Sequence, residues 1–571
     1  MRWRRALLVF TGVVCALVMA TPGLAGAHAT LVSSVPADDS RVAISPSQVV
    51  LTFDENISVG ADPARVISAQ GDRVDTGSPH LISAGNALVI PVRPDLPAGS
   101  YSATWRVISA DTHVVTGSIV FGVRADPGAP APAAPPVAAS VTALDRASQA
   151  LLYAGLVGSV GLAVVSLMLY PRTLALKRFR WTVAPSWVLA VLACAGTVLV
   201  RAAEKADVGV SRAFSGSALS SGLDGGDTRV VLIRAALVVV LGPVLFAAAR
   251  RRVSHAWGAA LIGACGLGIA VTIAADGHAS VGDLVWLAMP VTILHVVAMT
   301  LWLGGLLSMV LILLSGNRSR FPATVTSKSV TSKSVASEPP APEPSAPELL
   351  TPAVLHRWSR WAFTMVVVLV LSGEFQAWRQ IWPVQALWDT TYGVVLLVKS
   401  ALVLAMLGLA AYARRRLGLS RLRRSVPIEM ACGIAVLVVT SVLVTEPPAR
   451  TTYGPPMQVA APLDDGAAQV SVSTTRRGPT VVDVALDDGH GTPIPARSLR
   501  ATLSSESAGI PSLALRFVAA QSDTTVASSS GAARWRSVAA SVPVAGAWTL
   551  TLTVQFSDTD AQVTTVGFAV W

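Results

Sequence analysis

The sequence predicts a multi-domain membrane protein, in which an exported all-β sandwich precedes a bundle of eight transmembrane helices and a second exported β-sandwich follows it. Hydrophobic residues make up 52% of the 571 residues and charged residues only 13%, as in proteins that cross a membrane several times. Apolar segments of spanning length fill the middle of the chain. Runs of alternating apolar and polar residues, typical of strands, fill both flanks.

Residues 1–27 have the features of a signal peptide. A basic start precedes an apolar core, and the small residues Ala25-Gly-Ala27 form a cleavage site. We therefore expect the mature chain to begin at His28. An uncleaved membrane anchor is the alternative interpretation.

Residues 28–124 are predicted to form the first β-sandwich. Apolar residues alternate along the chain, as at Val49, Leu51 and Phe53, and Pro and Gly interrupt the runs. Residues 125–145 are rich in Ala and Pro, so we expect an extended linker there.

Eight apolar segments follow, each close to the ~20 residues that a bilayer requires. Basic residues cluster on alternate connections, which the positive-inside rule assigns to the cytoplasm. We therefore expect a multi-pass protein of the cytoplasmic membrane with both termini outside after signal cleavage. These clusters also account for the formal net charge of +11, so nucleic acid is not an expected partner. The segments lie near residues 149–170, 184–203, 229–249, 254–275, 286–314, 361–380, 392–413 and 427–446.

The membrane domain, residues 146–446, is predicted to contain one long cytoplasmic loop, 317–355. A repeated Ser/Lys/Val unit and a Pro/Glu-rich run indicate disorder in this loop. Residues 447–571 are polar and strand-like again and predict the second exported β-rich domain. Of the four cysteines, one lies in the signal segment and three in predicted helices, so no disulfide framework is expected outside.

A candidate metal site lies near the end of the first sandwich. Asp111 and His113 are two residues apart in a strand-like run, so their side chains would face the same way. Nitrogen and oxygen donors in such an arrangement suit Cu(II). His28, as the first residue of the mature chain, would add an imidazole and a free amine. The alternative is a surface carboxylate that merely lies beside a strand histidine.

The stretches around these residues resemble the CopC copper-binding family. In that family the mature N-terminal histidine and an Asp-x-His motif bind Cu(II), so the resemblance implies His28, Asp111 and His113 as the ligands. Some members also have a Met-rich Cu(I) site, but no methionine occurs between His28 and the first membrane segment. The matching stretches are His28-Ala-Thr-Leu-Val-Ser-Ser-Val-Pro-Ala37, Val49-Val-Leu-Thr-Phe-Asp-Glu-Asn-Ile57, Leu96-Pro-Ala-Gly-Ser-Tyr-Ser-Ala-Thr-Trp105 and Gly117-Ser-Ile-Val-Phe-Gly122.

Titratable side chains inside spanning segments are costly, so their default interpretation is functional. His278 lies at the outer end of the fourth segment, and His295 lies ~15 Å down the fifth. His295, Met299 and Trp302 share one helix face, and imidazole with thioether can hold Cu(I). Packing is the alternative role for Met299, as it is the expected role for Trp302.

Glu374 in the sixth segment and Lys399 in the seventh both lie ~10 Å below the outer surface. They could form an intramembrane ion pair, which would reduce the cost of burial without binding copper. Equally, they could line a polar pathway.

The membrane domain resembles the CopD family over about residues 145–446. Membership implies copper handling, and His278 and His295 match the family's histidines. Gly304 and Gly305 are expected to let two helices approach closely. The motifs that carry the resemblance are Gly277-His-Ala279, His295-Val-Val-Ala-Met-Thr-Leu-Trp-Leu-Gly-Gly305, Tyr392-Gly-Val-Val-Leu-Leu-Val-Lys399 and the region of Glu429.

The sequence therefore predicts a copper protein that captures Cu(II) outside and handles or imports copper, as Cu(I) or Cu(II), across the membrane. No ATPase motif is present, which favours movement down a gradient. Sequestration, or delivery to exported copper proteins without transport, is the alternative. A histidine-brace oxidative enzyme is disfavoured because Asp111 adds an anionic ligand, and no enzymatic activity is expected. Copper, the lipid bilayer, exported copper proteins and a reductase are the candidate partners.

Overall fold

The computed structural model describes most of the chain outside its N-terminal segment and a few loops. The described residues are 29, 31–109, 114–128, 138–171, 173, 177–223, 226–250, 252–280, 284–315, 350–414, 419–507, 510–519, 533–537, 540–542 and 544–571. The expected signal segment, the three expected Cu(II) ligands and residues 317–349 of the expected loop lie outside them.

Two four-stranded sheets form the N-terminal domain, which confirms the predicted sandwich. Their strand orders are β1-β3-β6-β5 and β2-β8-β7-β4, and every pairing is antiparallel except that of β2 with β8. Strand β3 alternates as expected, and its Val49, Leu51 and Phe53 lie in the core between the sheets. The strands are β1 (Leu31–Val35), β2 (Ser40–Val42), β3 (Gln48–Phe53), β4 (Ile57–Ser68), β5 (His80–Ile82), β6 (Ala87–Pro91), β7 (Gly99–Ser109) and β8 (Val114–Val123), with a 3-10 turn η1 (Ser83–Gly85) before β6.

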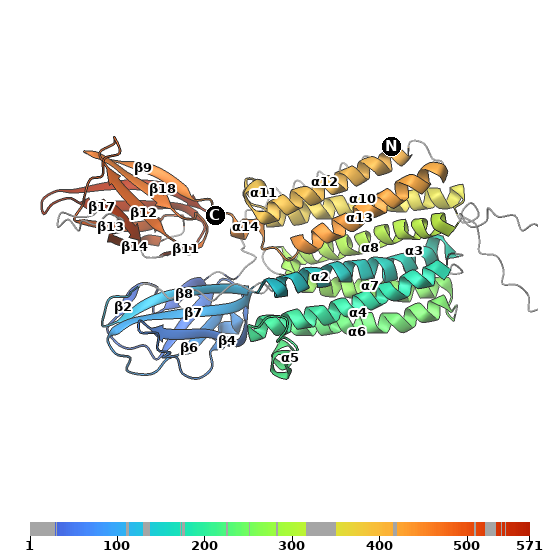
Figure 1. Ribbon diagram of the computed structural model, residues 1–571, viewed down its shortest axis with the longest axis horizontal. Coiled ribbons are helices and arrows are strands. Elements are labelled where there is room, and N and C mark those ends of the chain that lie inside the picture. The colour runs from blue at the N-terminus through green and yellow to red at the C-terminus, as the bar shows by residue number, and fades with distance from the viewer. Residues whose placement is uncertain are drawn as a thin grey trace, which may run out of the picture.

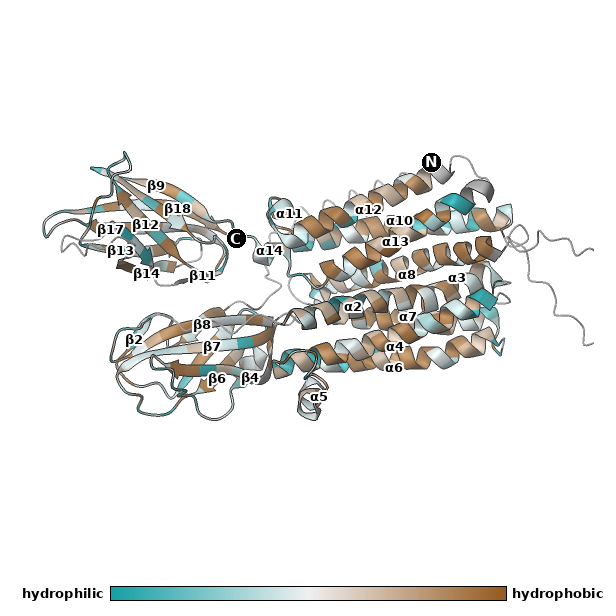
Figure 2. Ribbon diagram, in the orientation of Figure 1, coloured by the Kyte–Doolittle hydropathy of each residue, from teal (hydrophilic) through white to brown (hydrophobic). Residues whose placement is uncertain are grey.

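The described residues contain eight helices long and apolar enough to cross a membrane, which confirms the predicted number. Figure 2 shows the apolar residues that dominate this bundle. The first span is continuous through α2 (Ala139–Leu156), a π-helical turn η2 (Val157–Gly161) and α3 (Leu162–Leu169). The other spans lie in α4 (Lys177–Ala206), α6 (Gly226–Ala249), α7 (His255–Ala275), α8 (Val285–Ser315), α10 (Pro352–Gln380), α12 (Thr391–Arg414) and α13 (Leu419–Leu443). Shorter elements are α5 (Gly216–Leu223), η4 (His278–Ser280), α11 (Ala386–Asp389) and α14 (Ala449–Thr452).

Two helices begin inside stretches that the sequence predicted to be a linker or a loop. Helix α2 starts at Ala139, inside the expected linker 125–145, and α10 starts at Pro352, inside the expected loop 317–355. The side chain of Thr351 caps α10 by accepting a hydrogen bond from the Val354 amide. Charged residues occur in the first three turns of both helices, as at Asp145 and Arg146 of α2 and at Arg357 and Arg360 of α10. A search for apolar segments omits these turns although the helix continues through them.

The first span lies at the centre of the bundle, because 83% of its apolar window is buried. It touches α8 where two glycines meet. A Cβ atom on Gly304 would lie 2.3 Å from the carbonyl carbon of Gly161, and one on Gly305 would lie 2.0 Å from the Trp358 ring. The prediction that Gly304 and Gly305 allow close approach is therefore confirmed.

The C-terminal β-rich domain is built on one eight-stranded sheet, ordered β18-β17-β13-β14-β15-β12-β10-β9. Its two edge strands, β18 and β9, also pack together, so the sheet curls toward a barrel around a core that includes Trp548. A separate pair, β11 with β16, adds a short ribbon. The strands are β9 (Met457–Leu463), β10 (Gly466–Val472), β11 (Gly478–Thr480), β12 (Val482–Asp487), β13 (Ser498–Ser505), β14 (Ile510–Ala519), β15 (Arg534–Ser537), β16 (Ala540–Val542), β17 (Gly546–Gln555) and β18 (Ala561–Val570).

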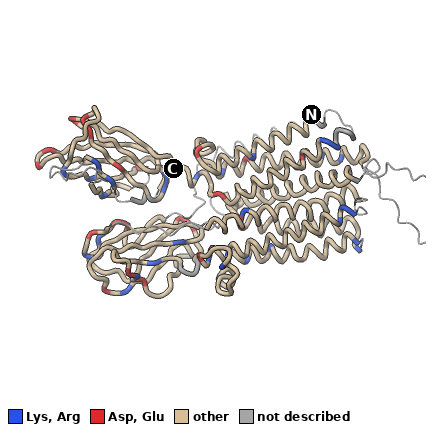
Figure 3. The backbone as a smooth tube through the Cα atoms, viewed as in Figure 1, with Lys and Arg blue, Asp and Glu red and all other residues tan. Residues whose placement is uncertain are grey.

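Both β-rich domains lie at the same end of the helical bundle (Figure 1). Arg106 of β7 forms an ion pair with Asp207, which follows α4, and this contact joins the first sandwich to the membrane domain. Two further ion pairs join the two β-rich domains, Arg477 with Asp54 at 3.5 Å and Arg516 with Asp39 at 3.2 Å. Basic residues gather at the opposite end of the bundle, as the positive-inside rule requires of a cytoplasmic face (Figure 3).

We predict that Gly304→Ala destabilises the bundle, since the added methyl group would overlap the backbone of Gly161. Overpacking of this kind typically costs ~1–3 kcal/mol. Gly408→Ala in α12 is the matched control, because nothing lies within 4 Å of its added Cβ atom. Thermal unfolding of the two purified variants measures the difference, and equal midpoints would show that the contact between the glycines does not limit packing.

Candidate functional site

The described residues that flank the expected Cu(II) ligands converge at one end of the first sandwich. Leu31, three residues after His28, pairs with Phe53 at the end of β3. Two residues beyond Phe53, Glu55 accepts a hydrogen bond from the Ser109 hydroxyl at the end of β7. Asp111 and His113 come two and four residues after Ser109 in the chain and, like His28, lie outside the described residues. A shared metal site formed by these three residues therefore stays a prediction. The described residues beside them, Leu31 and Ser109, lie at the same end of the sandwich, as such a site requires.

A cavity of about 1100 Å³ runs into the membrane domain from its outer end. Its walls come from the first span and from α4, α6, α7, α8, α10, α12 and α13. All five polar or sulfur-containing residues singled out in the predicted spans line this one cavity: His278, His295, Met299, Glu374 and Lys399.

The hydrogen bonds of His295 define which ring nitrogen carries the proton. Its Nδ1 lies 2.8 Å from the Ser372 hydroxyl oxygen. That hydroxyl donates its only proton to the carbonyl of Val368, so Nδ1–H must be the donor to Ser372. The Nε2 atom of the neutral ring therefore keeps its lone pair for a metal ion or a proton.

Met299 combines the two roles that the sequence left open. It lines the cavity one helical turn beyond His295, and it also packs against the apolar core of the bundle. Trp302 lines the cavity as well but is only 7% exposed, in keeping with its predicted packing role. An imidazole and a thioether thus lie on the same cavity wall.

His278 belongs to the short turn η4 between α7 and α8, at the outer part of the cavity. Its carbonyl accepts a hydrogen bond from Nη1 of Arg379 at 3.3 Å, and the carbonyl of Arg379 in turn accepts one from Arg450 at 2.9 Å. The turn that carries His278 is therefore fixed to the outer end of α10.

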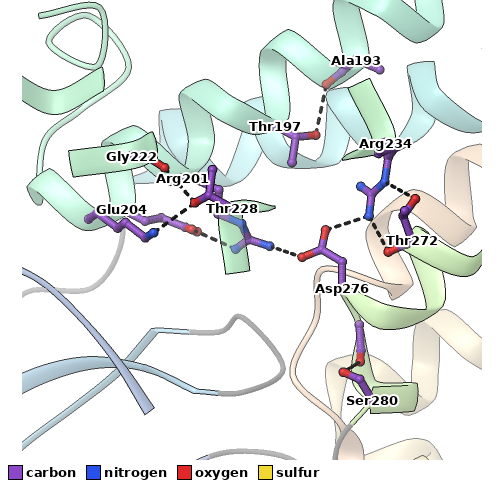
Figure 4. A network of polar contacts seen from close by, with 12 residues as sticks. Ala193, Thr197, Arg201, Glu204, Gly222, Thr228, Arg234, Thr272, Asp276 and Ser280 are labelled. Atoms are coloured by element: carbon purple, nitrogen blue, oxygen red, sulfur yellow. Dashed lines mark hydrogen bonds and ion pairs between the residues drawn. The ribbon is translucent and has the colours of Figure 1, made fainter. Parts of the chain in front are cut away.

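Next to this turn, Asp276 joins two arginines from different helices (Figure 4). Its carboxylate lies 3.1 Å from Nη2 of Arg201 in α4 and 2.9 Å from Nη2 of Arg234 in α6. Arg234 also donates to both the hydroxyl and the carbonyl of Thr272. Because all three charged side chains are at least nine-tenths buried, the contacts hold α4, α6 and the end of α7 together in a low-dielectric region.

Sequence reasoning missed this network, although a signal was present. Arg201 and Arg234 lie inside the predicted segments 184–203 and 229–249, where the cost of an intramembrane charge applies to them as it does to Lys399. Their shared partner could not be read from the sequence, because Asp276 is far from both along the chain.

Glu374 and Lys399 line the same cavity but come from α10 and α12. Among the described residues no ion pair joins them, and neither makes a hydrogen bond. Their direct pairing stays a prediction, and both side chains lie on the wall of the cavity, the other position that the sequence left open for them.

The cavity lining contains as many acidic as basic side chains. Their formal charges cancel, so the cavity lining has no net positive charge that would repel an entering cation. The basic ones are Arg146, Arg201, Arg234, Arg379 and Lys399, and the acidic ones are Asp145, Glu204, Asp276, Glu374 and Glu446.

The outer end of the cavity reaches the first sandwich. Thr116 of β8 belongs to the lining, and it pairs across the sheet with Arg106, the residue that binds Asp207. Thr116 is also three residues after His113 in the chain. The expected capture ligands are thus close in sequence to the wall of the membrane cavity. No cluster of three or more His, Cys, Asp or Glu that could hold a metal occurs among the residues that the structure describes.

Comparison with known proteins identifies two domains. Residues 31–124 match the CopC domain, and residues 352–443 match Copper resistance protein D, the CopD family. The chain is 28% identical to the copper transport protein CutJ of Bacillus subtilis (strain 168) over 509 residues, which cover 86% of each protein. It is 38% identical to copper resistance protein C of Escherichia coli over 115 residues, or 19% of this chain and 90% of that protein.

Solved structures of CopC proteins are similar to a part of this chain. CopC from Methylosinus trichosporium OB3b shares 29% sequence identity, covers 18% of this chain and 95% of that chain, and aligns with a TM-score of 0.16. The chain is thus a fusion of a CopC domain with a CopD membrane domain. Both domains are those that the sequence predicted, and the described residues of this multi-pass membrane protein include eight candidate spans.

We predict that Asp276→Asn strongly destabilises the membrane domain. The substitution removes the charge that two buried guanidinium groups share, and breaking a buried pair typically costs ~3–5 kcal/mol. Asp558→Asn is the control, because the Asp558–Arg497 pair is exposed and such pairs contribute ~0–1 kcal/mol. Thermal unfolding in detergent compares the two, and similar effects would refute a stabilising role for the buried network.

Proposed function

We propose that this CopC–CopD fusion captures Cu(II) outside the cell and passes copper inward through the cavity of its membrane domain. The observation that carries the proposal is the extent of one cavity, which is lined by Thr116 of the CopC domain at one end and by His295 and Met299 within the bundle. The protein would lie in the cytoplasmic membrane with both termini outside after signal cleavage.

Capture is assigned to His28, Asp111 and His113. Cleavage before His28 would free an α-amine, which gives the site three nitrogen donors and one carboxylate oxygen, a set suited to Cu(II). The short distance in sequence from His113 to Thr116 supports release of copper toward the outer part of the cavity.

Passage is assigned to the cavity, whose outer part is polar and whose inner wall carries His295 and Met299. Copper that leaves the polar part would meet the free Nε2 lone pair of His295 and the thioether of Met299. Nitrogen and sulfur donors favour Cu(I), so we assign Cu(I) to this inner position.

Direction and driving force follow from the same arrangement. The capture domain lies at one end of the bundle, and the basic residues at the other end are typical of a cytoplasmic face. Since the sequence holds no ATPase motif, inward movement would follow the gradient that intracellular copper binding maintains.

We predict that His113→Ala and Asp111→Ala each weaken Cu(II) binding by the purified full-length protein. Removal of a residue that only orients a metal ligand typically lowers metal affinity ~10–100-fold, so the loss of Cu(II) affinity in His113→Ala should be greater than this. The loss of Cu(II) affinity in Asp111→Ala should be smaller than that in His113→Ala. Binding should also weaken as the pH falls from ~8 to ~6, because imidazoles and an α-amine then gain protons. Isothermal titration measures both effects. Unchanged affinity in both variants would remove the capture site from the proposal.

We predict that His295→Ala abolishes copper accumulation by cells or proteoliposomes while Cu(II) binding by the CopC domain stays normal. The matched control is His356→Ala, an exposed histidine of α10 outside the cavity lining. Both variants must reach the membrane in normal amount, since His295 also contacts α10 through Ser372. Normal accumulation by a well-expressed His295→Ala protein would contradict passage through the cavity and favour sequestration outside.

A further inference from the structure

The proposed copper path requires a change of oxidation state, and the inference below rests on that path. The capture ligands offer nitrogen and oxygen, which suit Cu(II), whereas His295 and Met299 offer nitrogen and sulfur, which suit Cu(I). One electron must therefore reach each copper ion between the two positions. The source of that electron has to be a molecule that can enter the cavity.

Protein thiols do not supply it among the residues that the structure describes. Cys194, Cys265 and Cys432 are free, but none of them lines the cavity. A cysteine pair that could cycle between thiol and disulfide is thus absent from the described path. The reductant must come from outside the chain.

The cavity is large enough for an organic molecule. Its volume of about 1100 Å³ lies at the upper end of the ~300–1,000 Å³ typical of small-molecule sites. Val370, Leu397 and Leu404 line it and are 40%, 46% and 68% exposed. They belong to the spanning parts of α10 and α12, so an opening on this side would lead to acyl chains rather than to water.

Two polar groups inside the cavity are matched to one kind of head group. Lys399 is a hydrogen-bond donor and Glu374 an acceptor, and neither has a hydrogen bond or an ion pair with a described residue. An unpaired charge at this depth is costly. A ligand with one oxygen that accepts from Lys399 and one hydroxyl that donates to Glu374 would satisfy both groups.

The depth of these groups selects the class of lipid. Counting from the outer ends of their helices, Glu374, Lys399 and His295 lie ~9–15 Å inside the bundle. Because α8 and α10 are ~45 Å long and the hydrocarbon core is ~30 Å thick, their ends extend ~7 Å beyond it, so Glu374 lies near the edge of the core while Lys399 and His295 lie within it. A phospholipid head group stays in the interfacial layer above the core. A quinol has an uncharged head that can lie within that core, oxygen atoms on opposite sides of its ring, and an apolar tail.

We propose that the cavity is a quinol site and that the bound quinol reduces Cu(II) on its way to His295. The head group lies between Lys399 and Glu374, and the tail leaves the cavity past Val370, Leu397 and Leu404. This adds a redox step to a protein whose relatives are described as transport and resistance proteins.

The reaction balances with the quinol as the only reductant. One quinol gives one electron to each of two Cu(II) ions in succession, and the products are one quinone, two Cu(I) and two protons. The hydroxyl that donates to Glu374 passes its proton to that carboxylate, and the hydroxyl beside Lys399 releases its proton to water that enters the cavity. Both protons then leave through the polar outer part of the cavity, where Gln376 and Gln380 each present a buried polar atom without a hydrogen-bond partner.

The test uses the full-length protein in liposomes under anaerobic conditions, with decylubiquinol as the probe and Cu(II) added outside. Quinol oxidation is followed by absorbance and Cu(I) by a Cu(I)-specific chelator. Protein-dependent oxidation should yield two Cu(I) per quinol. Lys399→Met and Glu374→Gln should slow it by about tenfold or more, as expected for the loss of a hydrogen bond to a charged group. Asp558→Asn, an exposed acid outside the cavity lining, should match the wild type.

A second arm supplies copper directly as Cu(I). Lys399→Met should then take up copper at the wild-type rate, because reduction is no longer needed, and this result also shows that the variant is folded. Lys399→Arg, which keeps a donor, should recover part of the quinol oxidation.

Three outcomes would overturn the quinol site: oxidation no faster than in protein-free liposomes, oxidation unaffected by either variant, or loss of Cu(I) uptake in Lys399→Met. Protein-dependent quinol oxidation without any copper uptake by the wild type would support the quinol site while refuting the proposed transport.

Discussion

The carboxylate of Asp276 is the contact on which the outer half of the membrane domain depends. Two guanidinium groups from α4 and α6 are buried among apolar helices, and a charge in such surroundings is tolerated only when it is paired and hydrogen-bonded. Asp276, the C-cap residue of α7, supplies that pairing two residues before His278. The same contacts that neutralise the arginines therefore fix the entrance of the cavity, because the helices that form its wall meet at this carboxylate (Figure 4).

The bundle combines a tightly packed part with a loosely packed one. The first span and α8 pack closely through Gly161 and Gly304, whereas only 17% and 6% of the apolar windows of α10 and α12 are buried. The cavity lies where these parts meet. Helix α8, which carries His295, thus faces the less buried helices α10 and α12 across the cavity. The cavity between them is large enough for a small molecule as well as a metal ion.

Much of this architecture could be predicted from local patterns. The number of apolar segments of spanning length predicted the number of transmembrane helices, and the alternation of apolar and polar residues predicted β3. The absence of a side chain at Gly304 indicated a close contact between helices. The predicted polar residues of the membrane share one cavity because each faces inward from its own helix, as the cost of lipid exposure requires. What the sequence could not provide were contacts between distant segments. Arg201 and Arg234 meet Asp276 only through helix packing. Charged residues near the starts of α2 and α10, such as Arg146 and Arg357, concealed where these helices begin.

The central claim is that copper binds within the membrane at His295 and Met299. It is tested most directly by X-ray absorption spectroscopy of the full-length protein carrying His113→Ala and Asp111→Ala, so that the capture site is disabled, after loading with Cu(I). The account predicts retained copper with both nitrogen and sulfur neighbours, and loss of the sulfur signal when Met299→Leu is added. No retained copper, or copper bound by oxygen and nitrogen alone, would contradict it.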